Sequence, residues 1–254
     1  TVYIATDGNG VHFLSHKDRK VVRRFFHDVN DKEGIRSNSI YSLLVDDRGA
    51  VWVGHFQAGL DYSLYQNGLF RTYAYLPQFN SANLSIRSFV NRGPEKVIGS
   101  RDGLFYINEA TGIVKSFVKP VLTSDLILTI CFYEGEYYIG TYGGGMMVLN
   151  PQTLSLKYFT QGDTELFQKG HIFCVKPDNR GNLWIGTSQG LFCYNGQTKQ
   201  IKNFTSTNSQ LPEGNVYEVS FDSTGKGWIA TETGMCIYDP VSYTHLRAHE
   251  TVLD

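Results

Sequence analysis

The chain of 254 residues is 41% hydrophobic and 14% aromatic, which is enough apolar surface for a folded core and excludes a disordered chain. Its 23 Lys and Arg nearly balance 24 Asp and Glu, so the formal net charge of −1 predicts no affinity for nucleic acid or for an anionic membrane. No apolar run approaches the roughly 18–20 residues that span a bilayer, and no charged-then-apolar leader opens the sequence.

A short apolar run that ends in a small residue and is followed by a glycine recurs six times. Intervals of 41–49 residues separate the small residues, which are Ala5, Gly54, Gly99, Gly140, Gly186 and Ala230. Such intervals, filled with strand signals, are typical of the blades of a β-propeller. We therefore predict an all-β fold, a β-propeller of four-stranded antiparallel blades, with a half blade at 2–14 and five full blades that end near Asp239. We expect this array of about five and a half blades to be incomplete and to begin inside a blade.

The segment 199–239 illustrates the predicted blade. Polar and apolar residues alternate at 200–204 and again at 215–221, which predicts a first and a second strand joined by the polar loop 205–214. Two more strands are predicted at 227–231 and 235–238. The last segment, 240–254, shows neither alternation nor turn signals and resembles a translated cloning or sequencing-adapter end. We therefore predict that the propeller repeats occupy 1–239 and that 240–254 is a tail outside the propeller and not native.

A tight turn with a leading aspartate recurs before the third strand of three blades. Each copy holds an Asp, a Gly three residues later and a Trp six residues after the Asp; the copies are Asp46, Gly49 and Trp52, then Asp178, Gly181 and Trp184, then Asp222, Gly225 and Trp228. We interpret the Asp as an acceptor for backbone donors and the Gly as the positive-φ residue of the hairpin. We expect the Trp to wedge between neighbouring blades, and the small residue that follows to let adjacent strands approach.

The four cysteines, Cys131, Cys174, Cys193 and Cys236, show neither CxxC spacing nor pairing with histidine. Each lies in a strand-like run, so we predict buried structural thiols, with a disulfide or a metal ligand as the alternatives. We predict no metal site and no cofactor, and cysteine usage leaves the compartment open.

Three segments resemble the two-component regulator propeller repeat: SIYSLLVDDRGAVWVGHFQAGL at 39–60, HIFCVKPDNRGNLWIGTSQGL at 171–191 and NVYEVSFDSTGKGWIATETGM at 215–235. The resemblance covers about residues 2–239, with three strong copies and three weaker ones. Two weaker copies lack the Asp turn and have Asn91 to Pro94 and Tyr133 to Glu136 in its place. Proteins with this repeat are typically periplasmic sensor regions of hybrid two-component histidine kinases, which are common in Bacteroidetes. These kinases resemble one another in detecting oligosaccharides and in controlling polysaccharide-utilisation genes.

The resemblance implies several properties of this chain. It would be a fragment of a seven-bladed propeller in the periplasmic part of an inner-membrane protein, and not itself an enzyme, because the kinase domains are absent. Its partners would be an oligosaccharide, the remaining blades and a second propeller of the same parent, and a second protomer in a homodimer. The region itself would contact no nucleic acid, and it would meet the membrane only through its parent.

The turns that follow the repeated small residue are the candidate ligand site. Equivalent turns of a propeller fall on one face, and planar aromatic, amide and charged side chains suit sugar recognition. The residues that these turns contribute are Asp7, Asn9, His55, Phe56, Gln57, Arg101, Asp102, Tyr142, Gln189 and Glu232.

Two other functions remain open from the sequence. Propellers also serve as lyases or glycosidases, which need a convergent acid–base pair or a histidine–metal set, but here the histidines are scattered and no carboxylate pair stands beside a partner. A platform for binding other proteins is the second alternative, and it is compatible with sensing.

Overall fold

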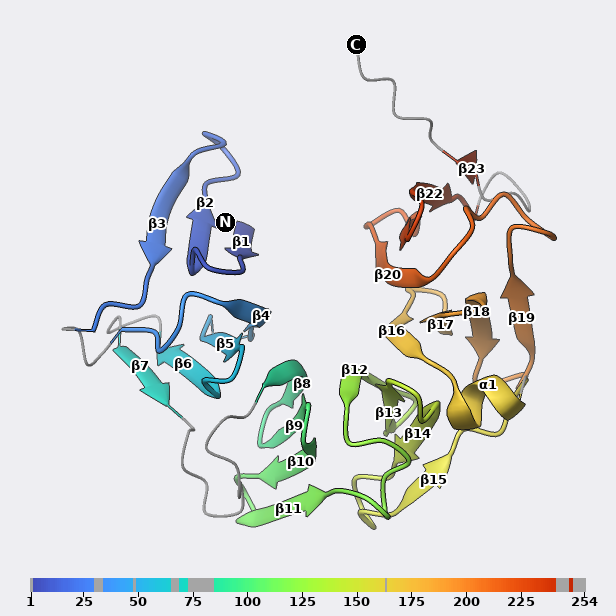
Figure 1. Ribbon diagram of the computed structural model, residues 1–254, viewed down its shortest axis with the longest axis horizontal. Coiled ribbons are helices and arrows are strands. Elements are labelled where there is room, and N and C mark those ends of the chain that lie inside the picture. The colour runs from blue at the N-terminus through green and yellow to red at the C-terminus, as the bar shows by residue number, and fades with distance from the viewer. Residues whose placement is uncertain are drawn as a thin grey trace. The chain divides into compact units, whose positions relative to one another are not determined.

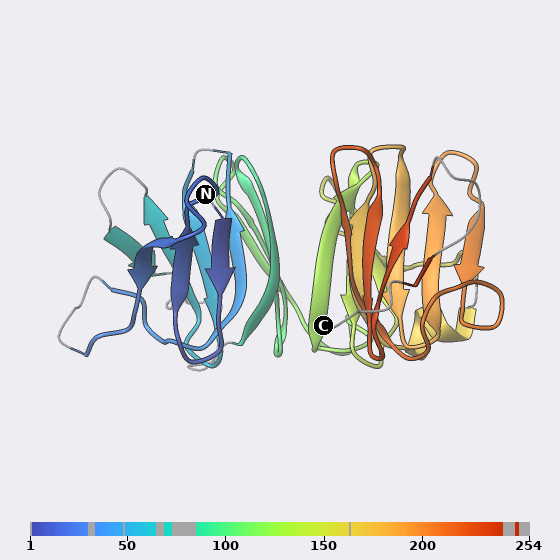
Figure 2. The same ribbon diagram turned by 90° about the horizontal axis from the view of Figure 1, so that it is seen from above.

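The computed structural model describes residues 2–29, 34–47, 49–64, 69–72, 85–162, 164–240 and 247–248. These residues form six antiparallel sheets of three or four strands in chain order, and the all-β propeller architecture predicted from the repeats is confirmed (Figure 1). Neighbouring strands of each sheet run in alternating directions (Figure 2). The chain divides into an N-terminal unit, 1–118 with 125–127, and a C-terminal unit, 119–124 with 128–254.

Three sheets make up the N-terminal unit. The first contains β1 (Val2–Ala5), β2 (Val11–Leu14) and β3 (Val21–Phe25). The second contains β4 (Ile40–Val45), β5 (Val51–His55), β6 (Leu60–Leu64) and β7 (Leu69–Thr72). The third contains β8 (Ile86–Arg92), β9 (Glu95–Ser100), β10 (Gly103–Asn108) and β11 (Ile113–Phe117).

Three more sheets make up the C-terminal unit, although β12 begins one residue before it. The fourth sheet contains β12 (Ile127–Tyr133), β13 (Glu136–Thr141), β14 (Met146–Leu149) and β15 (Leu156–Tyr158). The fifth contains β16 (Ile172–Pro177), β17 (Asn182–Thr187), β18 (Gly190–Asn195) and β19 (Ile201–Phe204). The sixth contains β20 (Val216–Phe221), β21 (Gly227–Thr231), β22 (Met235–Tyr238) and β23 (Arg247–Ala248). The helix α1 (Thr164–Lys169), too short to cross a membrane, joins β15 to β16.

The strands predicted in 199–239 are confirmed within one residue, but their assignment to a single blade is wrong. The strand β19, predicted as the first of this blade, pairs with β18 and closes the fifth sheet. A short hairpin at 196–200 joins β18 to β19, whereas the longer segment 205–215 leads to β20. Tight turns hold consecutive strands in one antiparallel ladder, and longer connections pass to the next sheet. The first sheet likewise has a third strand, β3, beyond the half blade predicted at 2–14.

Two of the three tryptophans occupy the predicted place between sheets. Trp52 is 4% exposed and packs against Ile86 and Ile98 of the third sheet. Trp184 is 1% exposed and packs against Val216 and other apolar residues of the sixth sheet. Trp228 is 42% exposed, because no later sheet covers it within the C-terminal unit.

The turns with a leading aspartate form as predicted. Asp178 accepts the backbone N–H groups of Arg180 and Asn182 at 2.8 Å, and its second oxygen accepts the Trp184 indole N–H at 2.9 Å. Asp46 makes the same pair of contacts, to the Ala50 amide at 2.8 Å and the Trp52 indole at 3.2 Å. Asp222 accepts the amides of Thr224 and Lys226, and the third residue after each Asp (Gly49, Gly181, Gly225) has a φ of +78° to +83°. These aspartates are therefore structural acceptors.

Three of the repeated small residues, Gly54, Gly140 and Gly186, stand where neighbouring sheets approach closely. A Cβ on Gly186 would lie 2.6 Å from the Val216 carbonyl oxygen of the sixth sheet, and one on Gly140 would lie 2.7 Å from Ile172 Cγ2 of the fifth. Contacts this short do not occur, so only glycine fits at these two positions, which confirms the predicted steric reason for them.

The four cysteines are free thiols, three of them buried and Cys193 partly buried. Burial raises the pKa of Cys131, Cys174 and Cys193 to about 12 and that of Cys236 to about 11. The prediction of structural thiols is confirmed for these residues. Of the tail 240–254, the structure describes Pro240 and β23, which pairs with β22; the remaining tail residues lie outside the described part, and its origin stays a prediction.

Candidate ligand-binding face

The turns between the second and third strands lie at one end of the sheets within each unit, which we call the turn face of that unit. Backbone hydrogen bonds tie four of these turns to the segment just before the first strand of the same sheet. In the N-terminal unit, Phe56 N donates to Ser39 O and Arg101 N to Ser85 O, both at 3.0 Å. In the C-terminal unit, Ser188 N donates to His171 O at 3.2 Å and Glu232 N to Asn215 O at 2.9 Å. The turns and the starts of the first strands therefore share a face.

Most of the predicted site residues are exposed on these faces. Phe56 is half-buried, and eight others are exposed: Asp7, Asn9, Gln57, Arg101 and Asp102 in the N-terminal unit, and Tyr142, Gln189 and Glu232 in the C-terminal unit. Two units carry these side chains, and each turn face is a separate candidate surface.

His55 lies inside the second sheet and not on its surface. Its side chain is fully buried, and its Nε2 lies 2.9 Å from Asp61 Oδ2, which also accepts the Arg36 amide at 2.8 Å. In other blades this position holds a hydroxyl residue, such as Thr141 or Thr187, that donates to the glycine carbonyl of its own turn. The last residue of the second strand points into the stack in each case, so His55 serves the core.

A β-bulge recurs in the first strand of four sheets, and it adds large side chains to the turn faces. The pairing register shifts between Ile40 and Ser42, between Ile86 and Ser88, and at the same place in β16 and β20. The extra residue of a bulge leaves the ladder and its side chain is redirected. The four extra residues are Tyr41, Arg87, Phe173 and Tyr217.

In the C-terminal unit two of these bulged residues, Phe173 and Tyr217, join two other rings in a row across three sheets. Tyr142 stacks on His171, with centroids 4.0 Å apart and planes 27° apart. His171 lies 6.2 Å from Phe173, which meets Tyr217 edge to face at 5.1 Å. We call these four residues the aromatic row. Tyr142 is 49% exposed and Tyr217 is 43% exposed, so both ends of the row offer ring surface to a ligand.

Polar groups stand beside the row. Asn215 donates its side-chain amide to the Tyr217 hydroxyl at 3.2 Å, and its backbone N–H to a Glu232 carboxylate oxygen at 3.2 Å. The predicted residue Gln189 is exposed on the neighbouring turn. His171 Nδ1 is buried without a hydrogen-bond partner among the described residues. The row therefore combines ring faces with amide, carboxylate and hydroxyl groups.

The N-terminal unit has a smaller cluster at the equivalent positions. Tyr41 lies 5.0 Å from Phe56, and the Arg87 guanidinium lies 5.2 Å from the Tyr41 ring centroid. The cation lies over the ring at a distance typical of cation–π contacts. This cluster is more cationic than the aromatic row of the other unit.

Sequence reasoning found Tyr142 and Phe56 but missed the bulge residues and His171. Their signal is visible once the blades are aligned. Each bulge is a triplet in which a β-branched residue is followed by a large residue, and the third residue resumes pairing with the second strand. The triplets are IYS at 40–42, IRS at 86–88, IFC at 172–174 and VYE at 216–218. The alternation of polar and apolar residues alone assigns the middle residue to an ordinary strand face. A bulge is a shift in the pairing of two strands, so the sequence of one strand does not reveal it.

The chemistry of these faces suits binding more than catalysis. Stacked rings offer rigid apolar area, and flanking amides and carboxylates pair with hydroxyls. In the described residues, no group of three or more His, Cys, Asp or Glu is placed to hold a metal ion.

Comparison with known proteins identifies the repeat. Residues 34–57 and 167–189 match the model of the two-component regulator propeller. No curated protein sequence matches the chain.

Solved structures with the same fold include extracellular domains of two hybrid two-component systems of B. thetaiotaomicron. BT3049 is 22% identical with a TM-score of 0.71, covering 98% of this chain and 34% of that one. BT4673 is 18% identical with a TM-score of 0.74, and the match covers 98% of this chain and 33% of BT4673. Virginiamycin B lyase from Staphylococcus aureus is 12% identical with a TM-score of 0.65, covering 84% and 70%. The chain thus spans about a third of the length of the two extracellular domains, and likeness at these identities establishes the fold.

Proposed function

Because the chain carries two-component regulator propeller repeats, we propose that it is a non-catalytic sensory module in the extracytoplasmic part of a hybrid two-component histidine kinase. The fold shared with extracellular domains of such systems supports this assignment. The kinase, the membrane anchor and the periplasmic location belong to the proposed parent protein.

The proposed ligand is an oligosaccharide, and the aromatic row is the observation that carries this proposal. Four rings from three consecutive sheets line up, and the two end rings keep nearly half of their surface accessible. The apolar face of a sugar ring can stack on an accessible aromatic ring, and its hydroxyls can pair with Asn215, Gln189 and Glu232. A surface built on rigid strands is also preorganised, which reduces the entropy lost on binding.

Calorimetric titration of the full chain with a panel of oligosaccharides tests this proposal. Replacing Tyr142 or Tyr217 with Ala removes an exposed ring and is expected to weaken binding about tenfold or more, as loss of a central aromatic contact does. Phe26→Ala is the matched control, because Phe26 is a 43% exposed aromatic residue of the N-terminal unit that is not part of the row. Unchanged affinity in both tyrosine variants would remove the aromatic row from consideration.

In this proposal, signalling changes the placement of rigid domains or of two protomers in a homodimer. A ligand shifts such an equilibrium only by binding one arrangement more tightly. In cells, the oligosaccharide that binds should induce polysaccharide-utilisation genes through the unaltered receptor and not through the Tyr142→Ala, Tyr217→Ala receptor. Induction by both receptors at equal sugar concentrations would contradict the proposal.

A further inference from the structure

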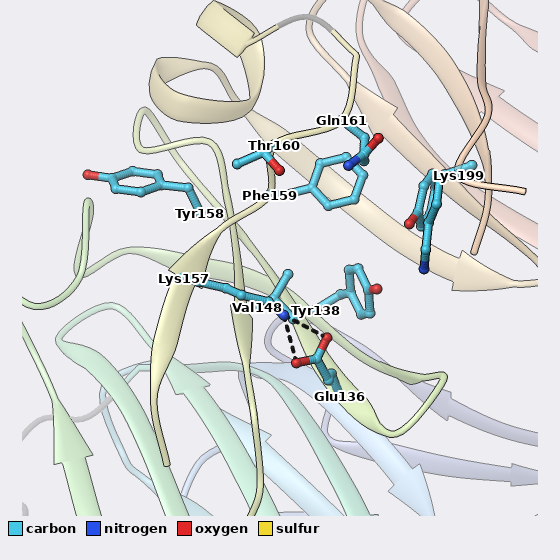
Figure 3. Close-up of a pocket in the computed structure, with 10 residues that line it drawn as sticks. Glu136, Tyr138, Val148, Lys157, Tyr158, Phe159, Thr160, Gln161 and Lys199 are labelled. Atoms are coloured by element: carbon cyan, nitrogen blue, oxygen red, sulfur yellow. Dashed lines mark hydrogen bonds and ion pairs between the residues drawn. The ribbon is translucent and has the colours of Figure 1, made fainter. Parts of the chain in front are cut away.

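A cavity of about 450 Å³ is lined by residues of the fourth and fifth sheets (Figure 3). None of the four residues of the aromatic row lines it. Its walls come from β13, β14, β15, the segment 159–161 and the β18 hairpin, all within the C-terminal unit. This volume falls in the range of about 300–1,000 Å³ that small-molecule sites have. We call it the lateral pocket.

Three packed aromatic rings form the apolar wall of the lateral pocket. Phe159 meets Tyr194 edge to face at 5.1 Å and lies 6.1 Å from Tyr138. Each of the three residues is between 3% and 6% exposed. They belong to the core cluster between the two sheets, so the wall is rigid before any ligand arrives.

The hydroxyls of Tyr138 and Tyr194 have no hydrogen-bond partner among the residues that the structure describes, although both rings are buried. A buried tyrosine usually pairs its hydroxyl. Tyr133, in the same core, does so: it donates to Gly181 O at 2.7 Å and accepts from Gly196 N at 2.8 Å. Tyr138 and Tyr194 instead line the pocket, where their hydroxyls can donate to or accept from a ligand. Burial raises the pKa of Tyr138, so its hydroxyl stays neutral.

The charges at the pocket cancel. Lys157 Nζ lies 2.9 and 3.1 Å from the two Glu136 carboxylate oxygens, and these two side chains face each other at the pocket wall (Figure 3). Lys199, the other lining lysine, lies 3.9 Å from a Glu134 carboxylate oxygen. An anion would gain little net attraction from these paired lysines. The pairs nonetheless present ammonium donors and carboxylate acceptors, and Gln161 adds an amide.

From these contacts we propose that the lateral pocket is a second binding site, which takes a small neutral polyhydroxylated ligand such as a mono- or disaccharide. The buried rings give the pocket a rigid apolar floor. The two tyrosine hydroxyls and Gln161 pair with ligand hydroxyls. Because each lining lysine is paired with a carboxylate, the pocket has no net positive charge that would favour an anionic ligand. The site is separate from the aromatic row and does not depend on it.

Titration of the full chain with glucose, galactose, xylose, maltose and cellobiose, beside glucuronic acid, tests the proposal. Tyr138→Phe and Tyr194→Phe keep the rings and remove only the hydroxyls. Each is expected to weaken binding of the neutral sugar about fivefold, and the double variant more, since one hydrogen bond contributes about 0.5–1.5 kcal/mol. Unchanged thermal unfolding midpoints confirm that the variants stay folded.

Variants of the aromatic row separate this site from the proposed function. Tyr142→Ala with Tyr217→Ala should leave binding in the lateral pocket unchanged. The proposal is overturned if no neutral sugar binds, if only glucuronic acid binds, or if the double Phe variant binds as the unaltered chain does. If all sugar binding disappears in the aromatic-row variants alone, the lateral pocket is not a sugar site, while the proposed function stands.

Discussion

The packing of tryptophan between sheets makes a quantitative prediction, because the chain holds a covered and an uncovered copy. Trp184 is 1% exposed and Trp228, at the same blade position, is 42% exposed. A tryptophan side chain buries about 150–250 Å², which at ~25 cal/mol per Å² corresponds to about 4–6 kcal/mol as an upper estimate. Measured Trp→Ala substitutions in cores cost about 3–5 kcal/mol. We therefore expect Trp184→Ala to lower the free energy of unfolding by about 4 kcal/mol.

Trp228→Ala should cost about 2 kcal/mol or less, because the ring is partly exposed and its removal leaves no enclosed cavity. Trp184 also donates to Asp178, a hydrogen bond that Ala cannot replace. Urea denaturation followed by far-ultraviolet circular dichroism measures both variants, and amide hydrogen exchange in β20 reports whether the neighbouring sheet loosens. Equal costs for the two substitutions, or unchanged exchange in β20, would refute the role assigned to the covered tryptophan.

Three further predictions follow from the charged and thiol groups. Hydrogen bonds from the Thr224 side chain and from nearby amides lower the pKa of Asp222. The stability that Asp222 contributes is therefore present above the ordinary carboxyl pKa and disappears as the pH falls through the lowered pKa. Carboxyl titration by NMR measures the lowered pKa, and the unfolding free energy of Asp222→Asn should depend less on acid pH. Asp61→Ala should cost about 3–5 kcal/mol in urea denaturation, because it leaves the buried His55 without its partner, and an effect below 1 kcal/mol would contradict the pairing. Burial raises the pKa of all four cysteine thiols, so mass spectrometry should find them unmodified by iodoacetamide at pH 8 in the folded chain and modified after denaturation.

Local patterns were sufficient to predict the strands within 199–239 and the three turns with a leading aspartate. Alternation and the Asp-to-Gly turn lie within a few residues of each other, so β20, β21 and β22 were predicted within one residue. The grouping of strands into sheets was less accessible. It depends on which ladder β19 joins, and that choice is made by the relative lengths of two connections and not by the strand itself.

The candidate sites show a sharper limit. Tyr142 was predicted because it lies on a turn, but its stacking partner His171 lies in the next sheet. The lateral pocket needs Tyr138 and Tyr194, which come from two sheets and carry no local mark of being neighbours. His55 was misplaced for a related reason: the turn rule describes the backbone, and the direction of this side chain follows from its buried partner Asp61.

The bulge explains how a repeat so constrained can acquire different ligands. Packing fixes the covered Trp position, the glycine that follows it and the Asp turn, since each contacts a neighbouring strand or sheet. The bulged residue is outside the ladder and therefore free of the pairing that holds its neighbours. At the bulges of the second, third, fifth and sixth sheets it is Tyr, Arg, Phe and Tyr, although the residue before it is always Ile or Val. Variation at this position changes the turn face without disturbing the stack, so differences in specificity among such repeats should concentrate there and in the adjoining turns.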